Sequence, residues 1–216
     1  MLSRDELQQV YDRVGTWQDS QAFYERPAID MLIRHSAFNE ASSVLEAGCG
    51  TGAFAQRLLA ELGAPGLRYE AIELSPVMAD IAQDAVAPFA GRATIRQNGG
   101  VPPLDVPTRS VDRVVAAYVL DVMTKAEVRQ FVTEAHDVLT PGGRLCVCGL
   151  APGPTGPSRI VSALWSAVHA LVPSVVGGCR PLTVRPVLNE ADWRILCHET
   201  VTPWSIASEV LVAQKR

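Results

Sequence analysis

The chain has 216 residues, of which 48% are hydrophobic and 19% charged, and its formal net charge is −4. This composition excludes a disordered or fibrous chain, and the length predicts one domain over residues 1–216. The negative charge offers no basic footprint for nucleic acid, so we expect no nucleic-acid partner. Five widely spaced cysteines without a Cys-x-x-Cys pair predict free thiols in a reducing compartment and no metal site.

The N-terminal residues are charged and lack an apolar signal core. The most apolar segment, 160–172, carries His169 and ends at Pro173, so it is too short to span a bilayer. We therefore expect a cytoplasmic protein without stable membrane insertion.

Helical patterns fill residues 1–40, ahead of the first predicted strand. Apolar side chains recur at helical spacing over residues 4–14, and a second helix is predicted over 20–35, with a bend or restart at Pro27. The aromatic side chains of this extension either pack on the core or belong to a lid over a ligand. They are Tyr11, Trp17, Phe23 and Tyr24.

From residue 43 onward, strand and helix patterns alternate, which is typical of a mainly parallel sheet. The final pair of strands has a short connection and must therefore be antiparallel. The sequence predicts an α/β fold, Rossmann-like, with a seven-stranded, mostly parallel sheet, an antiparallel C-terminal hairpin and an N-terminal helical extension. A cofactor-binding core is expected over 41–150 and a substrate-side region over 151–216. The predicted strands are 44–47, 67–73, 93–97, 111–117, 144–150, 193–201 and 206–213.

Three glycines, Gly48, Gly50 and Gly52, separate the first buried strand from the helix over 53–62. Glycine enters positive-φ conformations without steric cost, so these positions allow a tight turn and a close approach of a ligand to the main chain. The first N–H groups of the following helix point into the same space. This order of elements is typical of α/β folds that hold an adenine nucleotide or nucleoside cofactor.

Two carboxylates flank this turn. Glu73 ends the second strand, where such folds place an acid against ribose hydroxyls, and a carboxylate can accept two hydrogen bonds from a diol. Glu46 lies inside the first strand, where a buried acid needs a partner. A cationic ligand is one interpretation of that partner. A core acid bonded to backbone N–H groups or water is the other.

Together these segments resemble the class I S-adenosylmethionine-dependent methyltransferase superfamily. Residues 44–52 look like its first motif, with Glu46 in place of the commoner Asp. Residues 69–78 look like its second-strand motif, in which Glu73 would be the ribose-binding acid. Further likenesses are the strand-four entry at 110–115, the turn into strand five at 139–145, and, to the quinone-biosynthesis C-methyltransferase type, residues 11–14 and 23–25.

The resemblance implies S-adenosylmethionine as the cofactor. The superfamily usually places Asp or Glu after strand three to bind the adenine amino group. Here that position holds Asn98, or Gly99 if the alignment shifts, and an Asn carbonyl can accept the same hydrogen bond. The expected cofactor-binding residues are Glu46, Gly48, Cys49, Gly50, Gly52, Glu73, Leu74, Asn98, Gly99, Tyr118, Tyr11 and Tyr24.

The resemblance also implies methyl transfer, in which the sulfonium already activates the methyl group and the protein aligns the nucleophile and excludes water. Residues 118–123 follow strand four and are expected to face the substrate. Asp121 is a candidate general base or substrate-orienting group, and its alternative role is to cap the helix that begins near Thr124. Tyr118, the other candidate catalytic residue, either closes over the cofactor or packs.

The acceptor is expected to be a small molecule. The chain has no Asn/Asp-Pro-Pro-aromatic motif after strand four, as in nucleobase and glutamine amino-methyltransferases, and no Cys there for a pyrimidine C5 mechanism. The apolar helix over 160–172 either walls a pocket for a hydrophobic acceptor or packs on the sheet or a second subunit, which leaves a homo-oligomer open. Two alternatives to methyl transfer remain: a nicotinamide-dependent Rossmann oxidoreductase, disfavoured by the glycine spacing, and a non-catalytic S-adenosylmethionine-binding domain.

Overall fold

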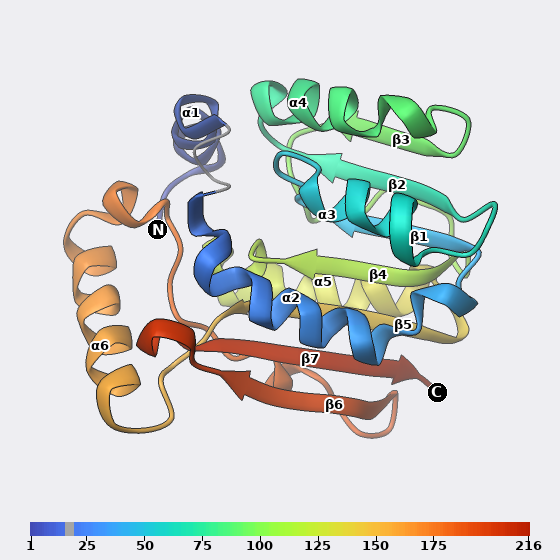
Figure 1. Ribbon diagram of the computed structural model, residues 1–216. Helices are drawn as coiled ribbons and strands as arrows, with labels where there is room; N and C mark the ends of the chain where they lie inside the picture. Colours follow the sequence, from blue (N-terminus) through green and yellow to red (C-terminus); the bar gives the residue numbers. More distant parts are fainter. Residues whose placement is uncertain (16–19) are drawn as a thin grey trace.

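One sheet organises the molecule, and the computed structural model describes it within residues 1–15 and 20–216 (Figure 1). In that part of the chain it has seven strands, in the order β3-β2-β1-β4-β5-β7-β6. Pairs among β1 to β5 are parallel, whereas β7 is antiparallel to β5 and β6. The predicted fold class is confirmed. The strands are β1 (Ser43–Ala47), β2 (Arg68–Glu73), β3 (Ala93–Gln97), β4 (Val111–Ala117), β5 (Leu139–Leu150), β6 (Trp193–Val201) and β7 (Ser208–Lys215).

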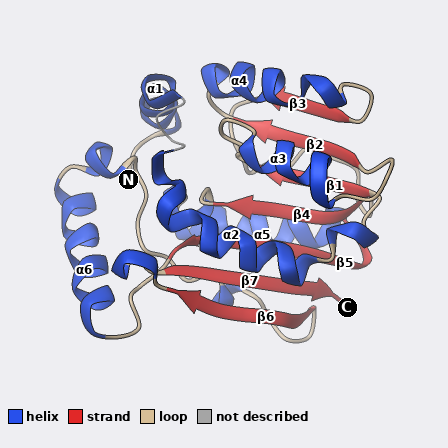
Figure 2. Cartoon of the chain, in the orientation of Figure 1, coloured by secondary structure: helices blue, strands red, loops and turns tan. Residues whose placement is uncertain are grey.

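Helices cover both faces of this sheet (Figure 2). Side chains of α2, α3 and α4 share one buried apolar cluster with the sheet, and α5 packs in another. α1 and α6 lie beyond the edge at which the parallel strands end (Figure 1). The helices are α1 (Arg4–Val14), α2 (Ala22–Ser36), α3 (Ala53–Arg57), α4 (Pro76–Val86), α5 (Lys125–Val138) and α6 (Gly156–Leu171).

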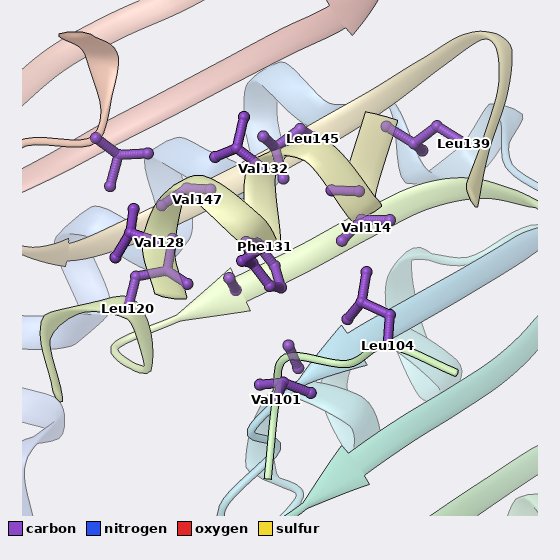
Figure 3. Close-up of a cluster of buried hydrophobic side chains, with 14 of the residues drawn as sticks. Val101, Leu104, Val114, Leu120, Val128, Phe131, Val132, Leu139, Leu145 and Val147 are labelled. Carbon is purple, nitrogen blue, oxygen red and sulfur yellow. The ribbon is translucent and has the colours of Figure 1, made fainter. Parts of the chain in front are cut away.

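The apolar cluster beneath α5 also holds a loop at the edge where the parallel strands end (Figure 3). Phe131 of α5 is fully buried against the sheet, with Val114 of β4 and Leu145 of β5 in the same cluster. Burying such a ring contributes roughly 1.5–3 kcal/mol. Val101 and Leu104 bring the loop after β3 into this cluster, so that loop is held by apolar packing as well as by its ends.

Three expectations about local structure need correction or delimitation. Pro27 does not restart a helix, because α2 continues through it. β5 begins at Leu139 rather than at Arg144, since Leu139 already pairs with Val111 before the register shifts. Trp17, one of the aromatic side chains considered for a lid, lies outside the described residues.

Candidate functional site

The strand order reverses between β1 and β4, at the edge where the parallel strands end. Open α/β sheets bind ligands at such a switch point. Two cavities meet there: the α1 cavity, which residues of α1 also line, and the α2 cavity, which residues of α2 also line. Residues that line both are Gly48, Gly50, Ala117 and Tyr118.

The glycine turn lies between the two cavities and is tightly packed. Gly48 has φ +68°, and a Cβ added there would lie 2.5 Å from Cγ2 of Val119. Gly52 has φ +79°, and its added Cβ would lie 3.0 Å from Cα of Ala82 in α4. Side chains are therefore excluded at both positions, by backbone conformation and by space.

Glu73 is buried at the end of β2, beside the α1 cavity. Its Oε1 accepts hydrogen bonds from the N–H groups of Leu74, at 2.9 Å, and Ser75, at 3.0 Å, and its Oε2 accepts one from Gly50 at 3.0 Å. Burial raises the pKa of this carboxyl, and these three backbone donors oppose the shift. A carboxylate offers about four acceptor positions, so about one remains for a ligand.

Glu46 lines the α2 cavity from inside β1. The Tyr69 hydroxyl donates a hydrogen bond to its carboxyl, so the partner predicted for this buried acid is a side chain rather than backbone or water. Burial raises the pKa of Glu46 to about 8, although the Tyr69 hydrogen bond lowers it. Glu25 and Cys49 line the same cavity.

The loop after β3 approaches the α1 cavity with different residues from those expected. The Asn98 side-chain oxygen accepts a hydrogen bond from the Gly100 N–H at 2.8 Å, and the Gly99 carbonyl accepts one from Arg4 at 2.7 Å. Among the described residues, Gly100 and Val101 line the cavity, whereas Asn98 and Gly99 do not. The sequence carried no pattern that singled out Gly100 or Val101.

α1 covers the α1 cavity and is attached at several points. Arg4 donates to the carbonyls of Gly99 and Pro102, each at 2.7 Å. Asp12 accepts a hydrogen bond from the Ser75 hydroxyl at 2.5 Å, next to Glu73. These contacts hold α1 over the glycine turn, and the sequence did not identify Arg4 or Asp12 as part of the site.

Asp121 lies in a short 3-10 turn, Leu120–Val122, and is only 2% exposed. Its Oδ2 accepts a hydrogen bond from the Leu150 N–H at 3.2 Å, whereas Oδ1 has no partner among the described residues. Burial raises the pKa of this carboxyl to about 6. The alternative capping role is wrong, because Thr124 caps α5 with its own side chain.

A small third cavity, which we call the tyrosine cavity, lies between Asp121 and two of the predicted aromatic residues, Tyr11 and Tyr24. It has a volume of about 30 Å³, enough for water but not for an acceptor. The rings of Tyr24 and Tyr118 meet edge to face with centroids 6.0 Å apart. The Tyr118 hydroxyl donates to Ser208 at 2.9 Å. Lining residues include Tyr11, Tyr24, Tyr118, Asp121 and Cys179.

The described residues contain no group of three or more His, Cys, Asp or Glu side chains that could hold a metal ion. Within the same residues, no helix has both the length and the apolar character needed to cross a membrane.

Solved structures share this fold over most of the chain. The cyclase SpnF superposes with a TM-score of 0.72 and 17% identity, covering 99% of this chain and 97% of its own. An O-methyltransferase family protein from Burkholderia thailandensis gives 0.68 and 16%, covering 99% and 59%. A geranyl diphosphate methyltransferase solved with GPP and sinefungin gives 0.66 and 15%, covering 88% and 77%. Identities this low show a common fold alone.

Sequence comparison is more specific. Residues 44–143 match the model of a family described as a methyltransferase domain. The resemblance to the class I methyltransferase superfamily is confirmed. Demethylmenaquinone methyltransferases of Tropheryma whipplei, strains Twist and TW08/27, are each 33% identical to this chain over 144 residues, which are 65% of this chain and 54% of theirs. The chain thus spans about half the length of these curated relatives.

The methyltransferase-domain match runs from β1 to Gly143 in β5. It includes Glu46, Glu73 and Asp121, but it leaves out α1, α2 and residues 151–216. Part of the tyrosine cavity, including Tyr24 and Cys179, therefore comes from segments outside the methyltransferase match.

Proposed function

We propose that the chain binds S-adenosylmethionine across the α1 and α2 cavities and transfers its methyl group to a small acceptor. The observation that carries this proposal is the placement of two buried carboxylates on either side of a glycine-rich turn, Glu73 on the α1 cavity and Glu46 on the α2 cavity. A nucleoside would occupy the first cavity and a cationic amino-acid end the second. The methyltransferase-family match and the neighbour solved with sinefungin support this assignment.

Glu73 would bind a ribose hydroxyl. Three of its roughly four acceptor positions already bind backbone N–H groups, so one direct hydrogen bond from the ligand is expected rather than two. Leu74, Met78 and Val101 give the α1 cavity an apolar lining that suits an adenine ring. Gly48 and Gly50 would let the ligand approach the main chain at the boundary between the cavities.

Glu46 would bind the cationic end of the cofactor in the α2 cavity. Because its pKa is about 8, the carboxyl is largely neutral near pH 7 until a cation arrives. A positive charge close to it favours the ionised form, so cofactor binding would release a proton from Glu46.

S-adenosylmethionine, when bound, supplies a methyl group already activated by its sulfonium. This chain's residues would then align the acceptor and exclude water, with α1 closing the cavity above. Asp121 would accept a proton from the acceptor's O–H, N–H or activated C–H group. Its unpartnered Oδ1 supports that role, and its pKa of about 6 leaves it ionised at neutral pH.

The acceptor would have to widen the tyrosine cavity, since its present volume admits only water. Tyr11, Tyr24 and Tyr118 would give it an aromatic wall with polar tips. A small, ring-containing hydrophobic acceptor fits this lining, and the names of the Tropheryma whipplei relatives, demethylmenaquinone methyltransferases, support the same class.

Calorimetry with S-adenosylmethionine and with its demethylated product tests the cofactor assignment. Binding of both is expected, and binding of neither would refute the proposal. Turnover against aromatic acceptors then tests methyl transfer itself. Cofactor binding without turnover over a broad acceptor panel would assign the chain to the non-catalytic alternative. Tighter binding of NADH would instead favour the oxidoreductase.

A further inference from the structure

Exposed apolar side chains follow one side of α6, which stands at the edge of the molecule (Figure 1). Ile160, Leu164 and Leu171 are 71%, 65% and 83% exposed, and their spacing places them on one face of the helix. Val175, in the turn that follows, is 71% exposed. Among the described residues of α6, only Ser158 is buried, so the helix leaves its apolar stripe to the outside.

Two exposed aromatic residues lie close to α6. Trp204 is 78% exposed in the short 3-10 turn Pro203–Ser205, which packs against both α6 and α2. Its ring meets that of Phe23, itself 57% exposed, edge to face at 6.4 Å. Large exposed apolar side chains that gather on one side of a protein mark interaction sites. We call this set the apolar face: Phe23, Ile160, Leu164, Leu171, Val172, Val175 and Trp204.

The charge of the segment that carries α6 differs from that of the whole chain. The chain has 23 Asp and Glu against 19 Lys and Arg, yet residues 151–189 contain no Asp or Glu at all. Cations of this segment are Arg159, Arg180 and Arg185. Arg185 pairs with Glu190, whereas Arg159 is exposed immediately before Ile160. The apolar stripe therefore begins beside an exposed cation and lies in a segment without acids.

We propose that the apolar face docks on the surface of an anionic lipid bilayer, with α6 lying in the plane of the interface. An apolar stripe on a protruding helix, an exposed cation at the start of that helix and exposed aromatic residues beside it are features that α6 shares with helices that bind at a lipid interface. Anionic headgroups would attract Arg159, while the apolar side chains enter the headgroup boundary. The contact that we propose is peripheral, with α6 at the surface of the bilayer.

A second copy of the chain is the competing occupant, and charge argues against it. Pairing two apolar faces would oppose two acid-free, cationic segments, with no carboxylate from 151–189 to neutralise either one. A lipid surface supplies the missing negative charge and adapts to a single protruding helix.

The face lies at the edge where the parallel strands end, which is also the edge of the α1 cavity (Figure 1). Lipid docking would therefore bring the acceptor side of the site next to a source of lipophilic molecules. This consequence rests on the proposed function, but docking itself does not.

Vesicle flotation with the full chain tests the proposal, using equimolar phosphatidylcholine and phosphatidylglycerol against phosphatidylcholine alone. The chain should float with the anionic vesicles. The double substitution Ile160→Ser, Leu164→Ser should weaken partitioning about tenfold or more, because it removes two apolar anchors. Arg159→Glu should weaken it several-fold on anionic vesicles only. Val77→Ser is the matched control, since Val77 is 39% exposed on α4, outside the apolar face.

No flotation of the unaltered chain, or equal flotation of the double variant, would overturn the proposal. So would a dimer in sedimentation velocity that the double substitution dissociates, because it assigns the face to a second copy. Calorimetry with S-adenosylmethionine on the same samples separates the two proposals: cofactor binding without flotation refutes docking alone, and flotation without cofactor binding refutes the proposed function alone.

Discussion

Two buried carboxylates at the same edge of the sheet are satisfied in different ways. Glu73 accepts hydrogen bonds from three backbone N–H groups, whereas Asp121 accepts one from Leu150 and leaves Oδ1 without a partner among the described residues. An unsatisfied buried polar atom costs about 1–3 kcal/mol. Most of the hydrogen-bonding capacity of Glu73 is thus filled before any ligand arrives, whereas Asp121 keeps a whole carboxylate oxygen available.

The substitution with the largest expected effect on this difference is Asp121→Asn. If Asp121 is the base, the variant should lose about 10²–10⁴-fold in kcat while binding S-adenosylmethionine normally. The rate of the unaltered protein should rise with pH through about 6, as Asp121 ionises, and this limb should vanish in the variant. Steady-state kinetics over pH 5–9 would measure both effects. Asp84→Asn, an exposed acid on α4, is the control, and an unchanged profile in Asp121→Asn would exclude Asp121 as the base.

One added methyl group should disrupt the tight packing of the glycine turn. Gly48→Ala should cost about 2–5 kcal/mol of unfolding free energy, because a positive φ is combined with a Cβ 2.5 Å from Val119. Gly66→Ala is the matched control: its φ is +87°, but nothing lies within 4 Å of its added Cβ. It should cost only about 1–2 kcal/mol. Equal losses of unfolding free energy for the two variants, measured by urea unfolding, would mean that the Val119 side chain moves aside. The turn would then be less rigidly packed than inferred.

The two sides also differ in how well the sequence predicted them. The Gly48–Glu73 side is built from elements that follow one another in the chain: a strand, a glycine turn and the acid that ends the next strand. Periodicity in the sequence identifies such elements. Asp121 was singled out as well, but its surroundings were not, because Cys179 and Leu150 reach it from distant segments. Arg4 and Asp12 were missed for the same reason.

α6 shows most clearly what the sequence pattern could not predict. Its apolar pattern predicted a helix correctly, within a few residues at either end. A pattern of apolar residues identifies a face but does not say what covers it, and here the face remains exposed instead of lining either large cavity.

The role of Glu73 can be tested with a substitution that retains two of its three backbone contacts. Glu73→Gln keeps an acceptor oxygen for Leu74 and Ser75 but removes the charge that would bind the ribose hydroxyl. We expect S-adenosylmethionine binding to weaken by about 1–3 kcal/mol, about 5- to 150-fold in Kd, by calorimetry. Glu70→Gln, on the same strand but paired with Arg96, should leave the Kd unchanged. An unaltered Kd in Glu73→Gln would remove Glu73 from the site.

The smallest expected effect concerns the other buried acid on the turn side, Glu46 with Tyr69. Its folded-state pKa of about 8 lies above the ordinary value of 4.5, so the folded chain keeps a proton that the unfolded chain loses. Stability from this group is therefore fully present below about pH 4.5 and falls as pH rises to about 8. Tyr69→Phe should lower the free energy of unfolding by about 0.5–1.5 kcal/mol at pH 6, where Glu46 is neutral. The loss should be larger above pH 8, where the hydroxyl donates to an ionised carboxylate.

Urea unfolding at pH 6 and pH 9 would measure this change. The same substitution in a Glu46→Gln background should show no increase with pH, since no charge then develops beside the hydroxyl. A pH-dependent penalty that persists without Glu46 would place the titrating group elsewhere. In that case ionisation of Glu46 would not be what strengthens the Tyr69 hydrogen bond, and the pKa of about 8 would not describe this carboxyl.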